Sequence, residues 1–324
     1  MSAVVTYVEA IRLALRSALE EDDRVVVLGE DVGRGGGAFR ATAGLQEEFG
    51  EQRVMDTPIS EAAFTGAAVG MALDGMRPVV EYQFSDFLTS GMNAIVNTAA
   101  KMHFRHGKAV PLVIRAPAAG GFAGGPFHSQ NPEAWFLHTP GLKVVCPATA
   151  EDAGLLLGAA IADPNPVMFF EQKSLYTRIK GEFSYSSAEP LAGAAVRRSG
   201  GDVTLVSYGA ALHLALAAAT TLSLEGIECE VIDLRVLCPL DFDTVATSVE
   251  KTGRCLIAHE DYPDYGVAAE LAARLAGELF TKLDAPVGRV GSNFWPIPFS
   301  PPLEAATLPS SDGIADAVRR IARF

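Results

Sequence analysis

Cysteine, tryptophan and long hydrophobic runs are all scarce in this sequence of 324 residues, which has four cysteines and two tryptophans. The absence of a CxxC pair argues against a disulfide framework or a zinc site and favours reduced thiols. Uncharged apolar stretches such as 154–162 fall well short of the ~20 residues that span a bilayer. We therefore expect a cytoplasmic protein without a transmembrane segment. The cysteines are Cys146, Cys229, Cys238 and Cys255.

An excess of basic residues and a basic leader are lacking as well. The chain has 26 lysines and arginines against 39 acidic residues, for a net charge of −13. This balance argues against nucleic acid as a partner and suits a cationic protein surface better. Residues 1–15 carry neither the basic region nor the cleavage site of a signal peptide, and their pattern predicts an amphipathic helix.

Several catalytic signatures are also missing. Four glycines between 33 and 37 follow a predicted strand but fit neither GxGxxG nor a P-loop. This pattern favours a flexible or substrate-facing loop over a dinucleotide site. No GxSxG sequence is present, so an α/β-hydrolase is unsupported. His103 and His106 lie at a basic helix end, where cation placement at a helix C-terminus explains them better than metal binding.

Short apolar runs alternate with longer helical patterns in the first half of the chain. Continuous apolar strands that alternate with helices imply a parallel sheet covered on both faces. A capping pattern at Thr149 and Asp152 fixes the start of one helix. The predicted strands are 24–28, 53–56, 78–84, 111–115, 143–146 and 167–171, and the predicted helices are 61–73, 86–104 and 150–162.

A second alternation follows a polar, turn-rich stretch. The pattern loses its period between 181 and 201, which predicts a linker. We therefore divide the chain into an α/β domain at 1–183, a linker at 184–200 and a second α/β domain at 201–324. In the second domain the predicted strands are 202–207, 228–234, 254–259 and 287–290, and the predicted helices are 210–225, 241–250, 266–283 and 313–322, with an extended proline-rich stretch at 295–302.

Two side chains are candidates for chemistry. Glu61 follows a proline turn and opens an apolar helix, where a charged carboxylate is costly unless it is partnered. It either binds backbone amides at the helix N-terminus or is kept for proton chemistry. His128 lies in the glycine-rich run 118–130 and is either an ordinary loop histidine or a ligand-facing group. Gln83 and Asp86 lie at a strand C-terminus, where open α/β sheets bind ligands.

Several motifs follow one another along nearly the whole chain. They include LGEDVG (28–33), RVMDTPISE (53–61), EYQFSDF (81–87), FHSQNPEAWFLHTPGLKVVCP (127–147), DPNPVMFFE (163–171) and VIDLRVLCPLD (231–241). Their order and spacing resemble those of one family, the β subunit of the thiamine-diphosphate-dependent E1 component of 2-oxoacid dehydrogenase complexes. The resemblance implies a transketolase-like pyrimidine-binding domain and a transketolase C-terminal-like domain, both doubly wound with mainly parallel sheets.

The resemblance implies a cofactor shared between two chains. The family holds thiamine diphosphate between an α subunit, which binds the diphosphate and its Mg²⁺, and the β subunit, which receives the aminopyrimidine. This sequence has no GDG segment followed by paired asparagines, the motif expected on the α chain. The resemblance therefore implies an α2β2 heterotetramer in which the β chain alone is inactive.

The resemblance also assigns catalytic roles to three residues. Glu61 matches the glutamate that hydrogen-bonds a ring nitrogen of the aminopyrimidine and so promotes loss of the thiazolium C2 proton. Glu30 matches an acidic residue behind that glutamate and is a candidate proton relay. His128 matches the active-site histidine that stabilises intermediates and assists acyl transfer to a lipoyl group.

Two further sets of residues match binding positions of the family. Some members have tyrosine where this chain has Phe87, so the resemblance implies ring stacking there rather than a hydroxyl contact. A structural turn would explain the residues around a possible K⁺ ion equally well. The set lining the aminopyrimidine pocket is Ile59, Gln83 and Phe87, and the set around a possible K⁺ ion, mostly through backbone carbonyls, is Leu112, Ala160, Ile161, Asp163 and Asn165.

The substrate and several alternatives stay open. The family decarboxylates 2-oxoacids oxidatively and acylates the E2 lipoyl group, and HSQNPEAWF resembles the branched-chain type a little more than the pyruvate type. The alternatives are an acetoin dehydrogenase β subunit and a non-catalytic assembly subunit. The failed glycine fingerprint disfavours a nicotinamide-dependent oxidoreductase. The expected partners are an E1 α subunit, for which the small-residue helix 65–75 suits close packing, and E2, whose binding domain is often basic.

Overall fold

The computed structural model describes residues 3–185, 191 and 193–324, which form two compact units. The first unit comprises Met1–Ala118 and Trp135–Ala192, and the second comprises Ala119–Ala134 and Gly193–Phe324. The glycine-rich segment 119–134 therefore packs with the C-terminal half, although it lies within the stretch 1–183 that we expected to form one domain. Packing between segments so far apart in sequence leaves no local pattern, and only the folded chain reveals it.

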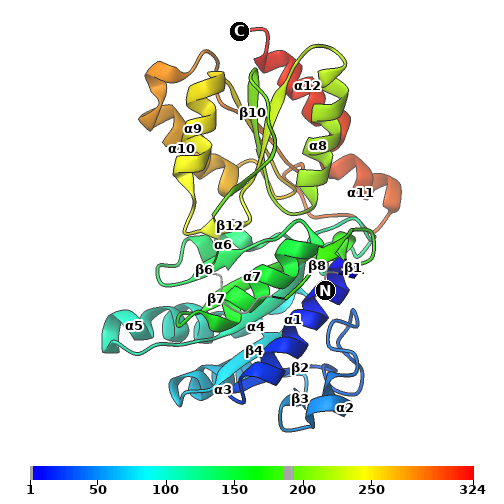
Figure 1. The fold of residues 1–324 in the computed structure, drawn as a ribbon, viewed down its shortest axis with the longest axis vertical. Coiled ribbons are helices and arrows are strands. Elements are labelled where there is room, and N and C mark those ends of the chain that lie inside the picture. The colour runs from blue at the N-terminus through cyan, green and yellow to red at the C-terminus, as the bar shows by residue number, and fades with distance from the viewer. Residues whose placement is uncertain (1–2, 186–190, 192) are drawn as a thin grey trace. The chain divides into compact units, whose positions relative to one another are not determined.

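A parallel sheet forms the centre of the first unit (Figure 1). Its strands run in the order β6-β7-β5-β4-β2-β3, and Val27 of β2 lies opposite Val54 and Val79 on its two neighbours. The buried apolar runs behave as the sequence predicts for strands covered on both faces. The strands are β2 Val25–Gly29, β3 Val54–Asp56, β4 Arg77–Glu81, β5 Val113–Ala118, β6 Lys143–Val145 and β7 Val167–Gln172.

Helices α1 and α7 lie side by side over this sheet, whereas α3 packs with α4 against β2 and β4 (Figure 1). The Thr149 hydroxyl accepts the backbone N–H of Asp152 and caps α7 as predicted. A 3₁₀ turn, η3 Lys173–Leu175, follows β7. The helices are α1 Tyr7–Glu21, α2 Leu45–Phe49, α3 Glu61–Leu73, α6 Glu133–Leu137 and α7 Ala150–Ala162.

The N-terminal residues differ from the single amphipathic helix that we expected. Strand β1 Ala3–Thr6 pairs antiparallel with β8 Lys180–Phe183, and α1 begins only after it. The Thr6 hydroxyl and the Glu9 carboxylate form a capping box at the junction. The β-branched residues before Thr6 favour a strand once a distant partner is available, and that partner cannot be read from the local sequence.

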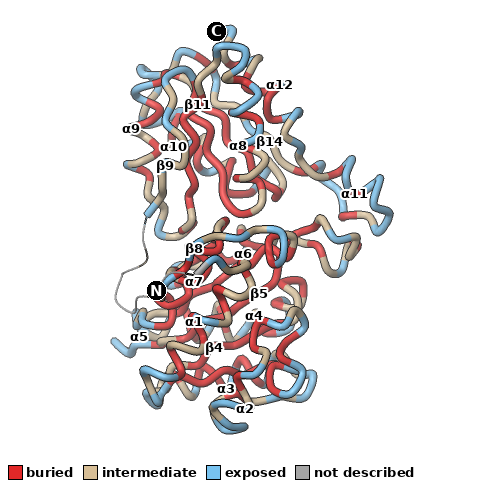
Figure 2. The backbone as a smooth tube through the Cα atoms, turned by 45° about the vertical axis from the view of Figure 1, so that its right-hand side comes forward, coloured by how far each residue is buried: buried red, intermediate tan, exposed pale blue. Residues whose placement is uncertain are grey.

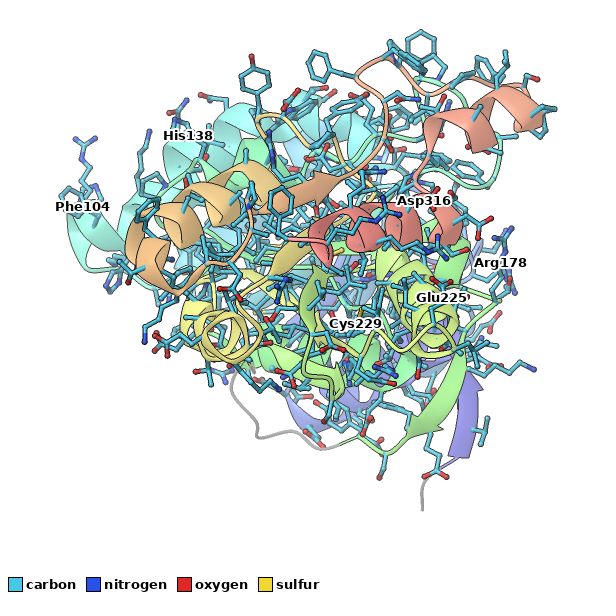
Figure 3. The ribbon with its side chains drawn as sticks, turned by 90° about the horizontal axis from the view of Figure 1, so that it is seen from above. Phe104, His138, Arg178, Glu225, Cys229 and Asp316 are labelled. Carbon is cyan, nitrogen blue, oxygen red and sulfur yellow. The ribbon has the colours of Figure 1, made fainter. Side chains whose placement is uncertain are left out.

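The predicted helix 86–104 is divided into short pieces. A 3₁₀ turn η1 Ser85–Phe87 leads into α4 Leu88–Asn93, a π-helical segment η2 Ala94–Ala99 and α5 Ala100–His106. The last turn of α5 is basic, as expected for side chains at a helix C-terminus. Phe104 of α5 projects from the surface and is 95% exposed (Figure 3).

The second unit is built on a mostly parallel sheet in the order β14-β13-β10-β11-β9. Strand β9 pairs antiparallel with β11 and lies within the stretch 184–200 that we expected to be a linker. Of that stretch, residues 186–190 and 192 lie outside the described residues. The strands of this sheet are β9 Ala195–Arg198, β10 Val203–Ser207, β11 Cys229–Asp233, β13 Cys255–Ala258 and β14 Gly288–Val290. The short strand β12 Val236–Cys238 is not part of this sheet.

Helices cover this second sheet from two sides, with α8 and α12 on one and α9 and α10 on the other (Figure 1). Arg319 of α12 donates to Glu225, which follows α8, and to Asp316, and both carboxylates are labelled in Figure 3. The proline-rich stretch ends in a helix, because proline suits the first helical positions. The helices are α8 Ala210–Ser223, α9 Phe242–Thr252, α10 Val267–Glu278, η4 Phe280–Lys282, α11 Pro301–Thr307 and α12 Ser311–Ile321.

Burial is concentrated along the strands of each unit (Figure 2). Strands β2, β5, β7, β10 and β11 are buried at every position. No disulfide links the cysteines. None of the helices in the described part of the chain combines the length and hydrophobicity that a bilayer span requires. The cytoplasmic compartment stays a prediction.

Candidate active site

Glu61 is the first residue of α3 and is partly exposed. The preceding Ser60 occupies the N-cap position, but its side chain makes no capping hydrogen bond and instead donates to the Pro58 carbonyl at 3.1 Å. Among the described residues, no hydrogen bond is recorded for the Glu61 carboxylate. The Glu61 carboxylate therefore does not cap the helix terminus, and it is available to bind a group from outside the chain.

Glu30 lies at the end of β2 and is 6% exposed. Its Oε1 is buried without a hydrogen-bond partner in the described structure, and the Ser60 backbone N–H binds the same carboxylate. Burial, and then the charge of Glu61, raise the pKa of Glu30. The ends of β2 and β3 thus bring two carboxylates together, one buried and inclined to hold a proton and the other open.

Tyr82 is a member of this site that the sequence did not reveal. It is buried, and its hydroxyl shares a hydrogen bond of 2.5 Å with the Thr65 hydroxyl on α3. Burial raises the pKa of Tyr82 to about 12, with smaller contributions from the charges of Glu61 and Glu30. The neutral phenol therefore lies beneath the first turns of α3 and fixes the helix that carries Glu61.

The glycine loop after β2 is tied down rather than left loose. The Asp56 carboxylate accepts the backbone N–H of Gly33 at 2.6 Å and that of Arg34 at 3.3 Å. Gly37 has a positive φ of 79°, and a Cβ there would clash with the Glu81 carboxylate. These contacts fix the loop that begins directly after Glu30, so the loop helps to position that carboxylate.

The three residues expected to line an aminopyrimidine pocket all lie in the first unit. Gln83 donates from Nε2 to the Asp31 carboxylate at 3.2 Å, next to Glu30 in sequence. Phe87 packs edge-on against Phe84 with ring centroids 5.7 Å apart. Ile59 is 83% exposed and offers a bare apolar surface two residues before Glu61.

A buried ion triad supports the same strand ends. Arg115 of β5, which is fully buried, donates to Glu81 of β4 and binds Glu171 of β7 through two hydrogen bonds of 2.6 and 2.8 Å. The Tyr176 hydroxyl donates to the same Glu171 carboxylate at 2.7 Å. Each charge is paired, as burial requires. The local sequence does not predict this network, because its members lie on three separate strands.

His128 lies in the second unit, apart from the unit that contains Glu61. The segment that carries it is closed at its base by the Ala119 N–H, which donates to the Gln130 carbonyl at 3.0 Å. Within the segment, the His128 N–H donates to the Gly125 carbonyl at 3.3 Å, which makes a turn. The imidazole is partly exposed.

Four of the residues expected around a K⁺ ion lie between the end of α7 and the start of β7, and the fifth, Leu112, directly precedes β5. The Ile161 carbonyl accepts a hydrogen bond of 2.7 Å from Arg77, and the Asp163 carboxylate pairs with Lys143. Asp163 also accepts the Asn165 N–H at 2.9 Å. Cationic side chains therefore already serve two of the five expected groups. In the described residues, no group of three or more His, Cys, Asp or Glu side chains is arranged to hold a metal ion.

The group formed by Glu30, Glu61 and Ile59 in the first unit fits an aromatic nitrogen heterocycle. A buried carboxylate oxygen of Glu30 lacks a partner, the Glu61 carboxylate is open, and the Ile59 side chain is bare. A carboxyl group beside an apolar surface is what a flat ring with a hydrogen-bonding nitrogen requires. The aminopyrimidine of thiamine diphosphate is such a ring, and its ring nitrogen carries a proton in the imino tautomer.

Two family models match the chain. The transketolase pyrimidine-binding domain matches residues 3–178, and the transketolase C-terminal domain matches residues 192–314. The fold is similar to that of a solved structure described as a split-gene transketolase in an inactive β4 tetramer. The two share a TM-score of 0.80 over 98% of each chain at 23% identity, which shows the fold alone.

Two relatives are similar in sequence to this chain over nearly its whole length. The 2-oxoisovalerate dehydrogenase subunit beta of Bacillus subtilis is 44% identical over 99% of this chain and 100% of its own length. The pyruvate dehydrogenase E1 component subunit beta of the same organism is 41% identical over the same shares. The chain therefore belongs to the transketolase-like family of E1 β subunits of 2-oxoacid dehydrogenase complexes.

Proposed function

We propose that this chain acts with an E1 α subunit to decarboxylate a 2-oxoacid oxidatively and to pass the acyl group to the lipoyl group of E2. A branched-chain 2-oxoacid is the favoured substrate, and pyruvate is the second candidate. The observation that carries the proposal is the open Glu61 carboxylate beside the buried, partnerless oxygen of Glu30, in a chain 44% identical to a 2-oxoisovalerate dehydrogenase β subunit.

The alternatives have less support. A non-catalytic assembly subunit would be free to lose the groups that carry proton chemistry, yet Glu61 and His128 are both present. The names of the relatives give no support to an acetoin dehydrogenase. Catalysis on a 2-oxoacid is therefore the function we carry forward.

The cofactor of the proposed reaction is thiamine diphosphate, which when bound supplies an electron sink for decarboxylation. Glu61 would hydrogen-bond a ring nitrogen of the aminopyrimidine and so favour the imino tautomer, in which that nitrogen carries the proton. Glu30 holds a proton at its buried oxygen and exchanges it with Glu61, for which its raised pKa is suited. Ile59 and Phe87 pack on the ring and exclude water, and Gln83 fixes the loop after Glu30 through Asp31.

His128 works on the substrate side of the proposed reaction. The imidazole is partly exposed, and its two ring nitrogens can serve as a hydrogen-bond donor and an acceptor. It stabilises the charge that develops on the substrate oxygen and assists acyl transfer to the lipoyl group. The glycines around it allow the backbone to approach the substrate closely.

In the proposed assembly, this chain contributes few groups to metal binding. Mg²⁺ would be held by the diphosphate and the α subunit. A K⁺ ion would use the carbonyls of Leu112, Ala160 and Asn165. The carbonyl of Ile161 and the carboxylate of Asp163 already receive Arg77 and Lys143, so they contribute less.

Two protein partners follow from the proposed reaction. The α subunit covers the exposed small-residue face of α3 in an α2β2 heterotetramer. The basic binding domain of E2 docks on the acidic second unit, where Asp243 and Glu270 are exposed. Equal binding of E2 after charge reversal at these two positions, Asp243→Lys and Glu270→Lys, would remove the E2 part of the proposal.

Co-expression with an E1 α subunit tests the proposal directly. The purified assembly is given thiamine diphosphate, Mg²⁺, a lipoylated E2 domain as the acyl acceptor and a panel of branched-chain 2-oxoacids, pyruvate and acetoin, and CO₂ release or acetoin cleavage is measured. We expect turnover of branched-chain 2-oxoacids only when both chains are present. Glu61→Gln should lower kcat by about 100-fold, within the range of lost acid–base catalysis.

The matched control is Glu51→Gln, an exposed glutamate of the same unit, which should turn over like the wild type. A preference for pyruvate would change the substrate, and cleavage of acetoin alone would change the reaction. Failure to turn over any 2-oxoacid in an intact assembly would contradict the proposed function.

A further inference from the structure

Two buried glutamates of the second unit bind backbone amides. Glu260 is 6% exposed and follows β13, and Glu304 is 5% exposed and lies on α11. A buried carboxylate is costly unless hydrogen bonds or a cation compensate its charge. Here the compensation comes from the glycine-rich segment that carries His128, which is more than a hundred residues away in sequence.

The hydrogen bonds fall on one short stretch of that segment. Glu260 Oε1 accepts the Gly120 N–H at 2.7 Å. Glu304 accepts the Gly121 N–H with Oε1 and the Ala123 N–H with Oε2, each at 3.0 Å. Both carboxylates are therefore engaged by the segment, and bonds to a charged acceptor are the stronger kind.

The far side of the segment is held as well. Asn131 Nδ2 donates to the same Glu260 oxygen at 3.5 Å, so one carboxylate touches both arms of the loop. The Phe299 ring lies against Gly125, where a Cβ would clash with it and where φ is +70°. Residues 124–130, with His128 among them, are thus fastened at both ends and packed from below.

The two carboxylates are themselves fixed in place. The Ser292 hydroxyl donates to the Glu260 carbonyl, which anchors the backbone after β13. The Glu304 N–H donates to the Ser300 carbonyl at 2.8 Å, in the first turn of α11. The proline-rich stretch and α11 therefore form a platform for a loop that its glycines would otherwise leave mobile.

We propose that Glu260 and Glu304 are positioning residues for His128, which they orient by binding the backbone amides of residues 120, 121 and 123. This inference rests on the proposed role of His128 in acyl transfer. Neither glutamate needs to touch substrate. The segment is joined to the first unit at both of its ends in sequence, and these bonds assign its conformation to the second unit.

The bonds themselves are tested without any enzyme activity, by hydrogen–deuterium exchange on the full chain. Glu304→Gln keeps the shape of the side chain but turns an NH₂ group toward one of two amide donors. We expect exchange at Gly121 and Ala123 to be on the order of tenfold faster, with β10 unchanged. Glu270→Gln, exposed on α10, is the matched control. Unchanged exchange in the segment would overturn the proposal.

The functional part is tested in the complete E1–E2 assembly by a double-mutant cycle. Glu304→Gln should lower lipoyl acylation on the order of tenfold, because small misplacements of a reacting group are costly. It should cause no further loss in a His128→Ala background, and exchange of the cofactor C2 proton, which depends on Glu61, should keep its wild-type rate. Glu260→Gln is the second variant and should behave in the same way.

The outcomes separate the two claims. Normal acylation by Glu304→Gln alongside impaired acylation by His128→Ala would overturn the positioning role and leave His128 in place. Equal losses in the wild-type and His128→Ala backgrounds would show that Glu304 acts elsewhere and would also overturn it. Normal acylation by His128→Ala would instead contradict the proposed role of the histidine itself.

Discussion

Glu30 and Glu61 are two residues of one type whose surroundings differ, although they lie close enough for the charge of Glu61 to raise the pKa of Glu30. Glu61 is partly exposed and has no recorded hydrogen bond among the described residues, whereas Glu30 is buried with one oxygen unpartnered. Burial disfavours the charged form and raises the pKa of Glu30. A buried acid behind an open carboxylate can hold a proton that the open one delivers.

A different pair at the residue scale links stability to pH. Burial lowers the pKa of His259 to about 4 from an ordinary 6.5, so its contribution to stability is lost as pH falls through that interval. Burial raises the pKa of Asp261 to about 7 from an ordinary 3.8, so its contribution is present at low pH and is lost as pH rises toward 7. The two contributions oppose each other between pH 4 and 6.5.

Asp261→Asn should therefore unmask the contribution of His259. Between pH 4.5 and pH 7.5, the unfolding free energy of the variant should rise by on the order of 2 kcal/mol more than that of the wild type. Urea unfolding of the full chain at several pH values measures this difference. Asp243→Asn, exposed on α9, is the control. Parallel curves for Asp261→Asn and the wild type would contradict the assignment.

Individual site residues were predictable only where a motif carries them. Glu30, Glu61 and Gln83 lie in short motifs whose order along the chain resembles a family, so the sequence predicted their roles, and those roles stay predictions. Tyr82 and Arg115 were missed because the local sequence around a tyrosine or an arginine in an apolar strand does not indicate its hydrogen-bond partners. Those partners, on α3 and on two other strands, are brought near only by folding.

At the scale of elements, glycine has different roles in α3 and in the neighbouring helix α4. A Cβ at Gly66 or Gly70 would meet no atom within 4 Å, so the outer face of α3 is open. On α4, a Cβ at Gly91 would clash with the Tyr82 hydroxyl. The glycine of α4 is required by packing within the unit, whereas those of α3 have no such reason.

Gly70→Ala should stabilise the chain by itself and weaken its assembly. Alanine favours a helix interior over glycine by about 1 kcal/mol, and the open face accepts the methyl group. If the α subunit covers this face, the same methyl group should weaken the binding of that subunit. Urea unfolding and α-subunit titration measure the two effects.

Gly91→Ala is the counterpart on α4 and should destabilise the chain, because the methyl group has no room. A Gly70→Ala chain that binds the α subunit as tightly as the wild type would place the α interface elsewhere.

Periodicity and capping predicted the elements whose stability is local. The ends of α3 and α7 agree with the predicted helices 61–73 and 150–162. The predicted helix 86–104 is broken by the π-helical segment η2, and β1, β8, β9 and β12 were missed. Each missed strand is edge structure that exists only through its partner, and its partner is distant in sequence or follows an irregular stretch.

At the scale of the whole molecule, the alternation of strands and helices predicted two α/β parts, and the comparisons confirm the two-domain fold. The packing of Ala119–Ala134 with the second unit was not predictable. That segment is held by hydrogen bonds with Glu260 and Glu304, which lie 129 or more residues away from their partners. A local reading of the sequence assigns a segment to its neighbours in the chain.

The most direct measurement is the rate of deuterium exchange at C2 of thiamine diphosphate, with this chain alone, with the α subunit alone and with both together. Exchange should be fast only with both chains, and Glu61→Gln should slow it by about 100-fold while the assembly stays intact by gel filtration. Fast exchange with this chain alone, or an undiminished rate in an intact Glu61→Gln assembly, would contradict a shared site activated by Glu61.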